Sequence, residues 1–335
     1  MKIIIDAFGG DNAPVEILKG AALAVKELGV NIIAVGDENE IKKAITSNSI
    51  EENGISIAHA ADIFKMEDNP VSIRHKGNET SMAVGLRLLR DGEGDAFVSA
   101  GSTGALVVGG TFIVKRIKGI KKTAIGSVMP GDNGPFMLMD SGANIDCTAK
   151  AIRQFAVMGS IYMKNVLGIE NPRVGLANIG KEENKGSQLY IDAYEMLKNT
   201  PEINFIGNAE ARDIPFTAAD VVVADGFTGN IILKTYEGTA LALLGNIKKI
   251  FTAGTLSKLS YLGVRKGLGD FKKKMDYKEY GGAALMGLTK PVIKAHGSSD
   301  AKAFKNAIRQ AAQYSEKRVI DGLSEHLSKE SGDDD

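Results

Sequence analysis

Short apolar runs rich in β-branched residues alternate along the chain with longer segments whose apolar residues recur every three or four positions. The short runs predict strands at residues 2–6, 31–36, 55–60, 95–101, 124–129, 136–140, 173–180, 203–209 and 220–226. The longer segments predict helices at residues 15–28, 38–46, 80–90, 103–117, 148–167, 228–251 and 299–327. Because strands and helices alternate, the pattern favours a mostly parallel sheet covered on both faces, a three-layer α/β/α fold.

The 335 residues show no internal repeat and no low-complexity linker, so residues 1–330 are expected to form a single α/β domain. The last five residues, SGDDD at 331–335, are expected to be a disordered tail. A chain of this length can bury a large core without disulfides or metal. Its single cysteine, Cys147, excludes an intrachain disulfide and therefore a secreted disulfide scaffold.

Charge and composition exclude several further classes of protein. Lys and Arg total 41 and Asp and Glu total 41, so the zero net charge predicts no nucleic-acid partner. The four histidines, at 59, 75, 296 and 326, form no spaced set with Cys147, so no metal site is expected. The chain opens on a strand-like run and has no apolar stretch of about 18 residues, which predicts a cytoplasmic protein without a membrane span.

Six junctions of glycine and small polar residues stand at 6–14, 99–106, 139–146, 177–187, 225–230 and 295–303, and five of them follow a strand predicted above. Ligands of open α/β sheets bind beyond the carboxyl ends of the strands, where helix N-termini favour anions. Glycine there lets the backbone approach a phosphate closely. Each junction alone fits an ordinary tight turn with a helix cap, but six together favour a shared anion site.

Familiar nucleotide and hydrolase motifs are absent from the sequence. Without G-x-x-x-x-G-K-[ST], G-x-G-x-x-G after the first strand, or G-x-S-x-G, a P-loop enzyme, a standard dinucleotide site and a serine hydrolase are disfavoured. No cofactor is therefore expected. What remains is an anion or acyl site built from backbone amides, hydroxyls and a few basic residues.

Residues 237–284 form a basic and apolar helical segment. Between 248 and 274, eight basic residues and one acid, Asp270, give a local charge of +7 in a chain that sums to zero. Apolar residues, among them Tyr261 and Val264, lie between the basic ones. This pattern fits a membrane surface, an acidic protein partner such as a carrier protein, or a dimer interface with a lysine-rich solvated face. The residues expected to make the contact are Lys248, Lys249, Leu256, Leu259, Leu262, Lys272, Lys273 and Lys274.

The junctions together resemble the PlsX family, the phosphate acyltransferases of bacterial phospholipid synthesis. The resemblance runs from residue 2 to about residue 310 through DAFGGDNAP, DGEGDAFVSAGSTGAL, LMDSGANID, VGLANIGKEENKG, FIGNAEARDIPF, DVVVADGFTGNIILKTYEG and YGGAALMGLTKPVIKAHGSSDAKAFKNAI. Asn12 stands where the family commonly has histidine, and Ser102 stands where it commonly has asparagine. Both departures argue against an obligatory chemical group at either position.

The resemblance implies that acyl-[acyl-carrier-protein] and inorganic phosphate give acyl phosphate and free carrier protein. The product feeds a membrane acyltransferase that acylates glycerol 3-phosphate. The resemblance also implies a cytoplasmic homodimer in peripheral contact with the membrane. The implied fold is similar to that of isocitrate and isopropylmalate dehydrogenases and of phosphotransacetylase.

On this resemblance, bound phosphate attacks the thioester directly, aided by positioning and electrostatics. Lys181 or Lys234 would neutralise charge, and His296 would donate to the carbonyl or to the leaving sulfur. Asp225, Thr228 and Asn230 would orient these groups. The expected phosphate- and substrate-binding residues are Asp6, Gly9, Gly10, Gly101, Ser102, Thr103, Gly104, Thr228, Gly229, Gly297, Ser298 and Ser299.

Several of these residues also have a purely structural interpretation. Asp225 fits a helix cap, His296 fits a turn, Ser298 and Ser299 fit N-caps, and Lys234 fits a solvated helix position. Cys147 is expected to be structural. In the first junction, Asp11 or Asn12 is expected to cap the helix at Pro14. Asp6 is expected to orient its neighbours, because a carboxylate repels phosphate.

Three alternative functions remain. The first is a phosphotransacylase that uses acyl-coenzyme A. The second is a non-catalytic module that binds phosphate or lipid. The third, a metal- and nicotinamide-dependent decarboxylating dehydrogenase, is disfavoured because glycine loops dominate the junctions and no arginine clusters are evident.

Overall fold

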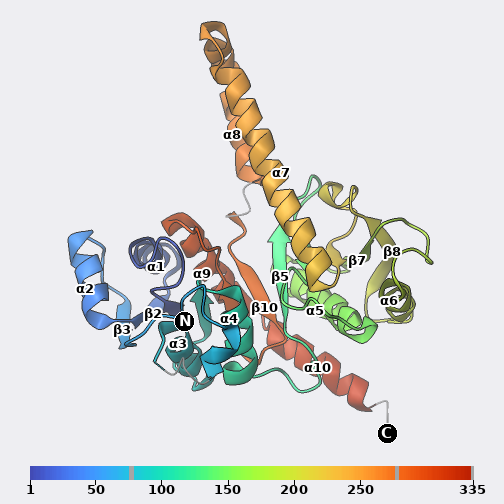
Figure 1. Cartoon of the computed structure of the whole chain (residues 1–335), viewed down its shortest axis with the longest axis horizontal. Helices are drawn as coiled ribbons and strands as arrows, with labels where there is room; N and C mark the ends of the chain where they lie inside the picture. The colour runs from blue at the N-terminus through green and yellow to red at the C-terminus, as the bar shows by residue number, and fades with distance from the viewer. Residues whose placement is uncertain (75–78, 276–278, 333–335) are drawn as a thin grey trace.

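The computed structural model describes residues 1–74, 79–275 and 279–332 and has the predicted three-layer α/β/α architecture (Figure 1). One eleven-stranded sheet has the order β3-β2-β1-β4-β11-β10-β5-β6-β9-β7-β8. Its strands are β1 (Lys2–Asp6), β2 (Asn31–Gly36), β3 (Ile55–His59), β4 (Ala96–Ser99), β5 (Ala124–Met129), β6 (Phe136–Met139), β7 (Arg173–Asn178), β8 (Asn204–Glu210), β9 (Val221–Val223), β10 (Ala283–Met286) and β11 (Val292–Lys294). The α-helices are α1 (Val15–Leu28), α2 (Glu38–Ser47), α3 (Ser81–Arg90), α4 (Thr103–Gly109), α5 (Ala149–Leu167), α6 (Gln188–Lys198), α7 (Gly226–Thr252), α8 (Thr255–Met275), α9 (Ala301–Glu316) and α10 (Val319–Gly332).

The direction of the strands reverses across the sheet. The pairings β11–β10, β10–β5 and β5–β6 are antiparallel, and the other neighbouring strands pair in parallel. Three reversals leave β6, β9, β7 and β8 running opposite to β1, β4 and β11. The six glycine junctions therefore divide between two ends of the sheet. Those after β1, β4 and β11 lie at what we call the first end, and those after β6, β7 and β9 lie at the second end.

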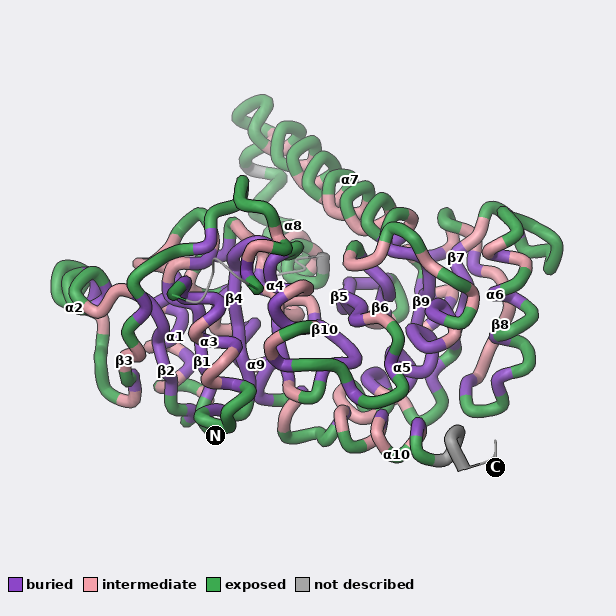
Figure 2. The backbone as a smooth tube through the Cα atoms, turned by 60° about the horizontal axis from the view of Figure 1, so that its bottom comes forward, coloured by how far each residue is buried: buried purple, intermediate pink, exposed green. Residues whose placement is uncertain are grey.

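The core forms because the central strands are apolar on both faces. Ile3, Ile4 and Ile5 of β1 are completely buried, as β4 is, which is typical of a parallel sheet between two helical layers. Figure 2 shows the buried backbone concentrated in the strands, with exposure increasing toward the outer helices. The helices α1 and α9 pack closely at Gly20, where an added Cβ would lie 2.7 Å from the carbonyl oxygen of Ala301.

All nine predicted strands and most predicted helices are confirmed to within a few residues. The closing helix predicted at 299–327 is instead two helices, α9 and α10, separated at Arg318, whose φ is 50°. The helix predicted at 103–117 ends earlier, because Lys115 has a φ of 77°. Elements α6, β10 and β11 were not predicted. The first two residues of the expected tail, Ser331 and Gly332, belong to α10, and 333–335 lie outside the described residues.

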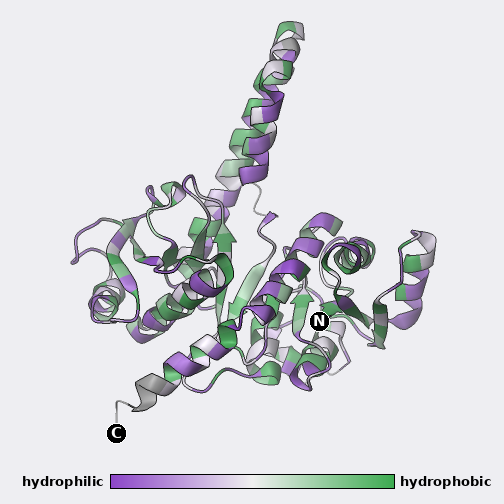
Figure 3. Ribbon diagram, turned by 180° about the vertical axis from the view of Figure 1, so that it is seen from behind, coloured by the Kyte–Doolittle hydropathy of each residue, from purple (hydrophilic) through white to green (hydrophobic). Residues whose placement is uncertain are grey.

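Helices α7 and α8 form a hairpin that projects from the body of the molecule (Figure 1). Near its base, the Tyr236 hydroxyl donates to the carbonyl of Pro130 at 2.7 Å and the ring contacts Phe136 edge-on. Farther out, Leu256 and Leu262 are 77% and 66% exposed, and Figure 3 shows hydrophobic and hydrophilic positions interleaved along both helices. None of the described helices is long and apolar enough to cross a membrane.

Candidate active site

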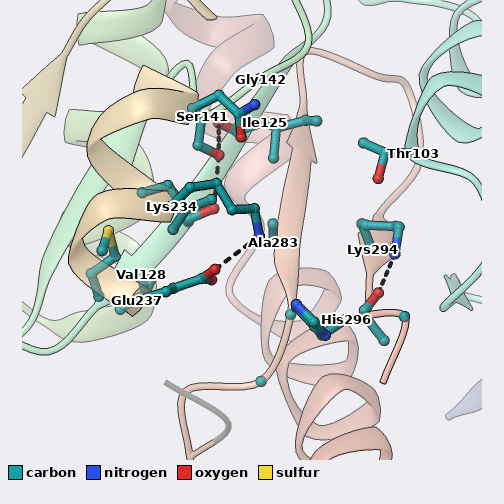
Figure 4. Close-up of a pocket in the computed structure, with 18 of the residues that line it drawn as sticks. Thr103, Ile125, Val128, Ser141, Gly142, Lys234, Glu237, Ala283, Lys294 and His296 are labelled. Atoms are coloured by element: carbon teal, nitrogen blue, oxygen red, sulfur yellow. Dashed lines mark hydrogen bonds and ion pairs between the residues drawn. The ribbon is translucent and has the colours of Figure 1, made fainter. Parts of the chain in front are cut away.

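A cavity of about 430 Å³ lies between α7 and the sheet (Figure 4). Its walls come from the junctions after β4 and β11 at the first end, from β5 and β10, and from Ser141 and Gly142 at the second end. Helix α7 begins at the second end, after β9, and runs back along the cavity through Asn230, Lys234 and Ala240. A long helix thus carries residues from one end of the sheet toward the other.

At the first end, Asp6 organises the backbone behind the cavity wall. Its carboxylate is only 2% exposed and accepts hydrogen bonds from the hydroxyls of Ser81 and Ser99, each at 2.7 Å. Burial raises the pKa of Asp6, and these two donors act against that effect. Ser99 Oγ in turn accepts from the N–H of Gly101 at 3.0 Å. The Gly101 amide is therefore held by Ser99 and is not directed at a ligand.

The glycines of the first junction allow this close packing. A Cβ on Gly9 would lie 2.6 Å from Asp6 Oδ2 and 2.7 Å from Gly101 N, and Gly10 has a φ of 99°. The expectation that Asp11 or Asn12 caps α1 is wrong, because no side chain caps that helix. The amide of Asn12 donates to the carbonyl of Ser299 at 3.2 Å, so the β1 junction is tied to the β11 junction.

The β11 junction holds His296 in one orientation. Its Nδ1 accepts a hydrogen bond from the N–H of Ser298 at 3.2 Å, so the neutral ring carries its proton on Nε2. Ser299 Oγ donates to the carbonyl of His296 at 2.7 Å and the residue is 2% exposed, so that hydroxyl supports the turn. Neither serine is the N-cap of α9; Asp300 is, accepting from Ala303 N at 2.9 Å.

Two lysines face the cavity, from different elements. Lys234 Nζ on α7 lies 2.8 Å from Oε2 of Glu237, which also lines the cavity. Lys294, the last residue of β11, donates from Nζ to the carbonyls of Ala100, at 3.2 Å, and of Ala295. Burial, with a smaller contribution from the charge of Lys234, lowers the pKa of Lys294 to about 8.

Lys294 is a site residue that the sequence did not predict, because the junction expected there begins at Ala295. The available signal was a lysine ending a short apolar run, VIK, directly before glycine and serine. Ser127 and Ser141 were missed as well. Their hydroxyls lie 2.7 Å apart in the cavity wall, and Ser141 Oγ also lies 3.1 Å from the carbonyl of Ile125.

The β9 junction mainly fixes the start of α7. Asp225 caps the helix by accepting from Phe227 N and Thr228 N, both at 2.9 Å, and its other oxygen accepts from Thr228 Oγ1 and from Tyr190. Burial opposes ionisation of this carboxyl, but these hydrogen bonds prevail and lower the pKa of Asp225. A Cβ on Gly229 would lie 1.9 Å from the carbonyl oxygen of Asp140. The structural interpretation of Asp225 as a cap therefore holds.

The predicted site residues fall into three groups: those that lie away from the cavity, those that line it, and those that support its walls from behind. Lys181 follows β7 at the second end and is 67% exposed, paired with Asp213 at 3.1 Å outside the cavity lining. Gly104 packs against Pro70, and Ser102 Oγ caps α4 by accepting from Ala105 N at 3.4 Å. The predicted residues that line the cavity are Gly101, Thr103, Asn230, Lys234, His296 and Gly297. Those that support its walls from behind are Asp6, Gly9, Gly10, Ser102, Asp225, Thr228, Gly229, Ser298 and Ser299.

The cavity thus combines cations and hydroxyls with apolar walls, and among the described residues no group of three His, Cys, Asp or Glu side chains is placed to hold a metal ion. A family model described as "Fatty acid synthesis protein" matches residues 1–321. A phosphate acyltransferase from Clostridioides difficile is 46% identical over 330 residues, covering 98% of this chain and 97% of that protein. The chain belongs to the PlsX family. A second relative, the phosphate acyltransferase of Clostridium acetobutylicum, is 45% identical over 98% of this chain and 99% of its own length.

Solved structures with the same fold support the architecture. A phosphotransacetylase from Streptococcus pyogenes superposes with a TM-score of 0.63 at 22% identity, over 96% of this chain and 94% of that one. A branched-chain phosphotransacylase from Enterococcus faecalis gives 0.59 at 15% identity, over 94% and 99%. These likenesses bear on the fold alone and confirm the predicted fold class. Membership of the PlsX family makes the chain an acyltransferase.

Proposed function

We propose that this PlsX-family chain makes acyl phosphate from acyl-[acyl-carrier-protein] and inorganic phosphate for phospholipid synthesis. The observation that carries the proposal is one continuous cavity with two chemically different parts. Thr103, Lys294 and His296 lie at its first-end side, and Val128, Met129 and Leu233 give it apolar walls beside α7. An anion and an acyl chain need such adjoining environments if they are to react.

The apolar part suits the acyl chain, and the polar part suits phosphate. With phosphate beside Thr103 and the thioester carbonyl between the two parts, an oxygen of phosphate attacks the carbonyl carbon and the thiolate departs. Phosphate is already a nucleophile at neutral pH and the leaving thiol has an ordinary pKa of roughly 8.5. The protein therefore needs mainly to position the reactants and to stabilise the developing oxyanion.

Direct attack also agrees with the surroundings of Cys147, the one thiol of the chain. Cys147 is not among the cavity-lining residues, and its Sγ donates to the carbonyl of Asn144 at 3.5 Å. Burial raises the pKa of Cys147 to about 11, so the side chain is a thiol at neutral pH and a poor nucleophile. A covalent acyl-cysteine intermediate is therefore not part of the proposal.

The test is an assay of the purified protein with palmitoyl-[acyl-carrier-protein], with and without inorganic phosphate. We expect phosphate-dependent release of the carrier thiol together with an acyl phosphate that reacts with hydroxylamine. Absence of phosphate-dependent release would overturn the proposal. Equal or faster turnover of palmitoyl-coenzyme A in a parallel reaction would instead favour the phosphotransacylase alternative.

We further propose that the chain is a homodimer that contacts the membrane peripherally, with product passing to the membrane enzyme that acylates glycerol 3-phosphate. The support is the hairpin of α7 and α8, which exposes Leu256 and Leu262 together with the cations Lys248, Lys249, Lys272 and Lys273. Lys274 instead reaches back to Asp132 at 3.1 Å, and the side chain of Leu259 lies outside the described part of the structure. Cations interleaved with exposed leucines suit an anionic lipid surface.

Reversing the charge of Lys248, Lys249, Lys272, Lys273 and Lys274 to glutamate is expected to reduce cosedimentation with anionic vesicles at least tenfold. The reason is that each lysine near such a surface contributes about 1 kcal/mol. Lys42→Glu with Lys43→Glu, on the exposed face of α2, is the matched control. Light scattering of both variants reports whether the dimer persists. Undiminished sedimentation of the five-residue variant would contradict the membrane contact.

A further inference from the structure

Lys294 is a largely desolvated cation that the fold itself does not explain. In the described part of the chain no carboxylate lies within ion-pair distance of its Nζ, whereas more exposed lysines such as Lys19, Lys42 and Lys198 each pair with an acid. Removing an ammonium from water without a counter-charge is costly. A cation kept in a cavity under these conditions is expected to meet an anion there that is not part of the chain.

The geometry directs this ammonium toward the polar part of the cavity. Lys294 pairs with Ser99 across β11 and β4, so its side chain starts where both strands end. Two of its three N–H donors are accounted for by the carbonyls of Ala100 and Ala295. In the view of Figure 4 the side chain lies on the same side of the cavity as Thr103, opposite Lys234 and Glu237. Both Lys294 and Thr103 line the cavity.

The charged groups around Lys294 make their direct contacts with other partners. Across the cavity, Lys234 pairs with Glu237, and its charge still lowers the pKa of Lys294. Behind the wall, the carboxylate of Asp6 accepts from the hydroxyls of Ser81 and Ser99. The charges of Asp6 and Asp11 raise the pKa of Lys294, but burial and Lys234 outweigh them. The imidazole of His296 is oriented by its own turn.

We propose that the ammonium of Lys294 binds the attacking phosphate directly and is the group that fixes it beside Thr103. This inference rests on the proposed function, since it names the residue that holds one of its two substrates. Arg and Lys are both suited to phosphate, but a lysine acts as a point charge whose proton is lost readily when it is buried. Phosphate binding should then depend on whether Lys294 is protonated.

The sign of that dependence follows from the lowered pKa. The free protein loses the Lys294 proton as the pH rises through about 8, whereas a bound dianion favours the charged form. Phosphate therefore binds to the protein with Lys294 in its ammonium form, and above pH 8 Lys294 takes up a proton when phosphate binds. The affinity falls roughly tenfold for each further pH unit, because one proton is linked to one binding event. Phosphate itself stays a dianion over this range.

The experiment is calorimetric titration of the full chain with inorganic phosphate at pH 7.5, 8.5 and 9.5, in two buffers of different ionisation enthalpy. For the unaltered protein we expect roughly tenfold weaker binding at pH 9.5 than at pH 8.5, with proton uptake. Lys294→Met should weaken binding at least tenfold at pH 7.5. Lys294→Arg should restore part of it and abolish the pH dependence, because arginine stays protonated. Lys290→Met, just before β11 and not among the residues that line the cavity, is the matched control.

Kinetics distinguish an anchor for phosphate from a merely structural lysine. Lys294→Met should raise KM for phosphate at least tenfold and leave KM for the acyl carrier within threefold. Phosphate binding that is equal in Lys294→Met and the unaltered protein, or that does not change between pH 8.5 and 9.5 in the unaltered protein, would overturn the inference. If phosphate binds with the expected pH profile but no thiol is released, the proposed function fails and the phosphate site stands.

Discussion

Replacing His296 with alanine is expected to lower kcat by roughly 100- to 1,000-fold, the usual effect of losing one donor to a developing oxyanion. The imidazole lines the cavity, and its Nδ1 accepts from Ser298 N, so the proton on the neutral ring sits at Nε2. A donor in a fixed orientation costs no reorganisation when negative charge appears on the carbonyl oxygen. Because the donor acts mainly in the transition state, KM for phosphate should change little.

Two further variants separate this role from that of the turn. His296→Gln retains an N–H donor near the position of Nε2 and should recover about tenfold of the lost kcat, whereas a purely structural histidine would show no such recovery. His59→Ala, which removes a histidine from the carboxyl end of β3 outside the cavity lining, should leave turnover unchanged. Steady-state rates of phosphate-dependent thiol release give the measurement. A His296→Ala enzyme within threefold of the unaltered kcat would exclude the assigned donor.

Comparing variants of His296 and Lys294 tests whether the two side chains have separate roles in catalysis and phosphate binding. Removal of the lysine is expected to appear in KM for phosphate, and removal of the histidine in kcat. The two residues lie two positions apart at the same junction, so a variant that merely disrupted the junction would change both parameters together. A clean split between the two kinetic effects would therefore assign phosphate binding to one side chain and oxyanion stabilisation to the other.

The elements that the sequence predicted well are those whose local pattern reflects their burial. β1 is a continuous apolar run because both of its faces are covered, and α1 and α5 keep an apolar stripe over several turns. The division of the closing helix at Arg318 could not be predicted, since a non-glycine residue adopts the positive φ there and no proline marks the break. Tertiary packing determines that break, and it leaves no local signal.

The candidate site was predicted only in part, for one physical reason. The strands β10 and β11 have four and three residues, which is too short for a periodic signal. Yet β10 takes part in two of the three antiparallel pairings that reverse the sheet. Because the reversal was not predicted, the six junctions were expected to form one shared site that included both Lys181 and His296. With β11 unrecognised, Lys294 was not seen as a residue at a strand end.

Asp6 was predicted to orient its neighbours, and the hydrogen bonds give that expectation a specific form. The carboxylate holds Ser99, whose Oγ holds the amide of Gly101 in the cavity wall. Asp6→Asn would place an amide N–H donor where Ser81 or Ser99 now donates, and a buried donor without an acceptor costs about 1–3 kcal/mol. We expect the free energy of unfolding to fall by about that amount, with a kcat at least tenfold lower because the wall behind the phosphate shifts.

Urea unfolding and steady-state kinetics measure the two effects, and Asp11→Asn in the same turn is the control for stability, since its exposed side chain has no comparable network. A double-mutant cycle tests the route through Ser99. If Asp6 acts through that hydroxyl, Asp6→Asn leaves the Ser99 hydroxyl without its acceptor, and Ser99→Ala removes the same hydroxyl. The loss of kcat in the double variant will then be smaller than the product of the two single losses. Independent, multiplicative effects would mean that Asp6 supports the wall through Ser81 and α3 instead. A free energy of unfolding within about 0.5 kcal/mol of the unaltered protein would show that the buried carboxylate is not needed to satisfy these donors.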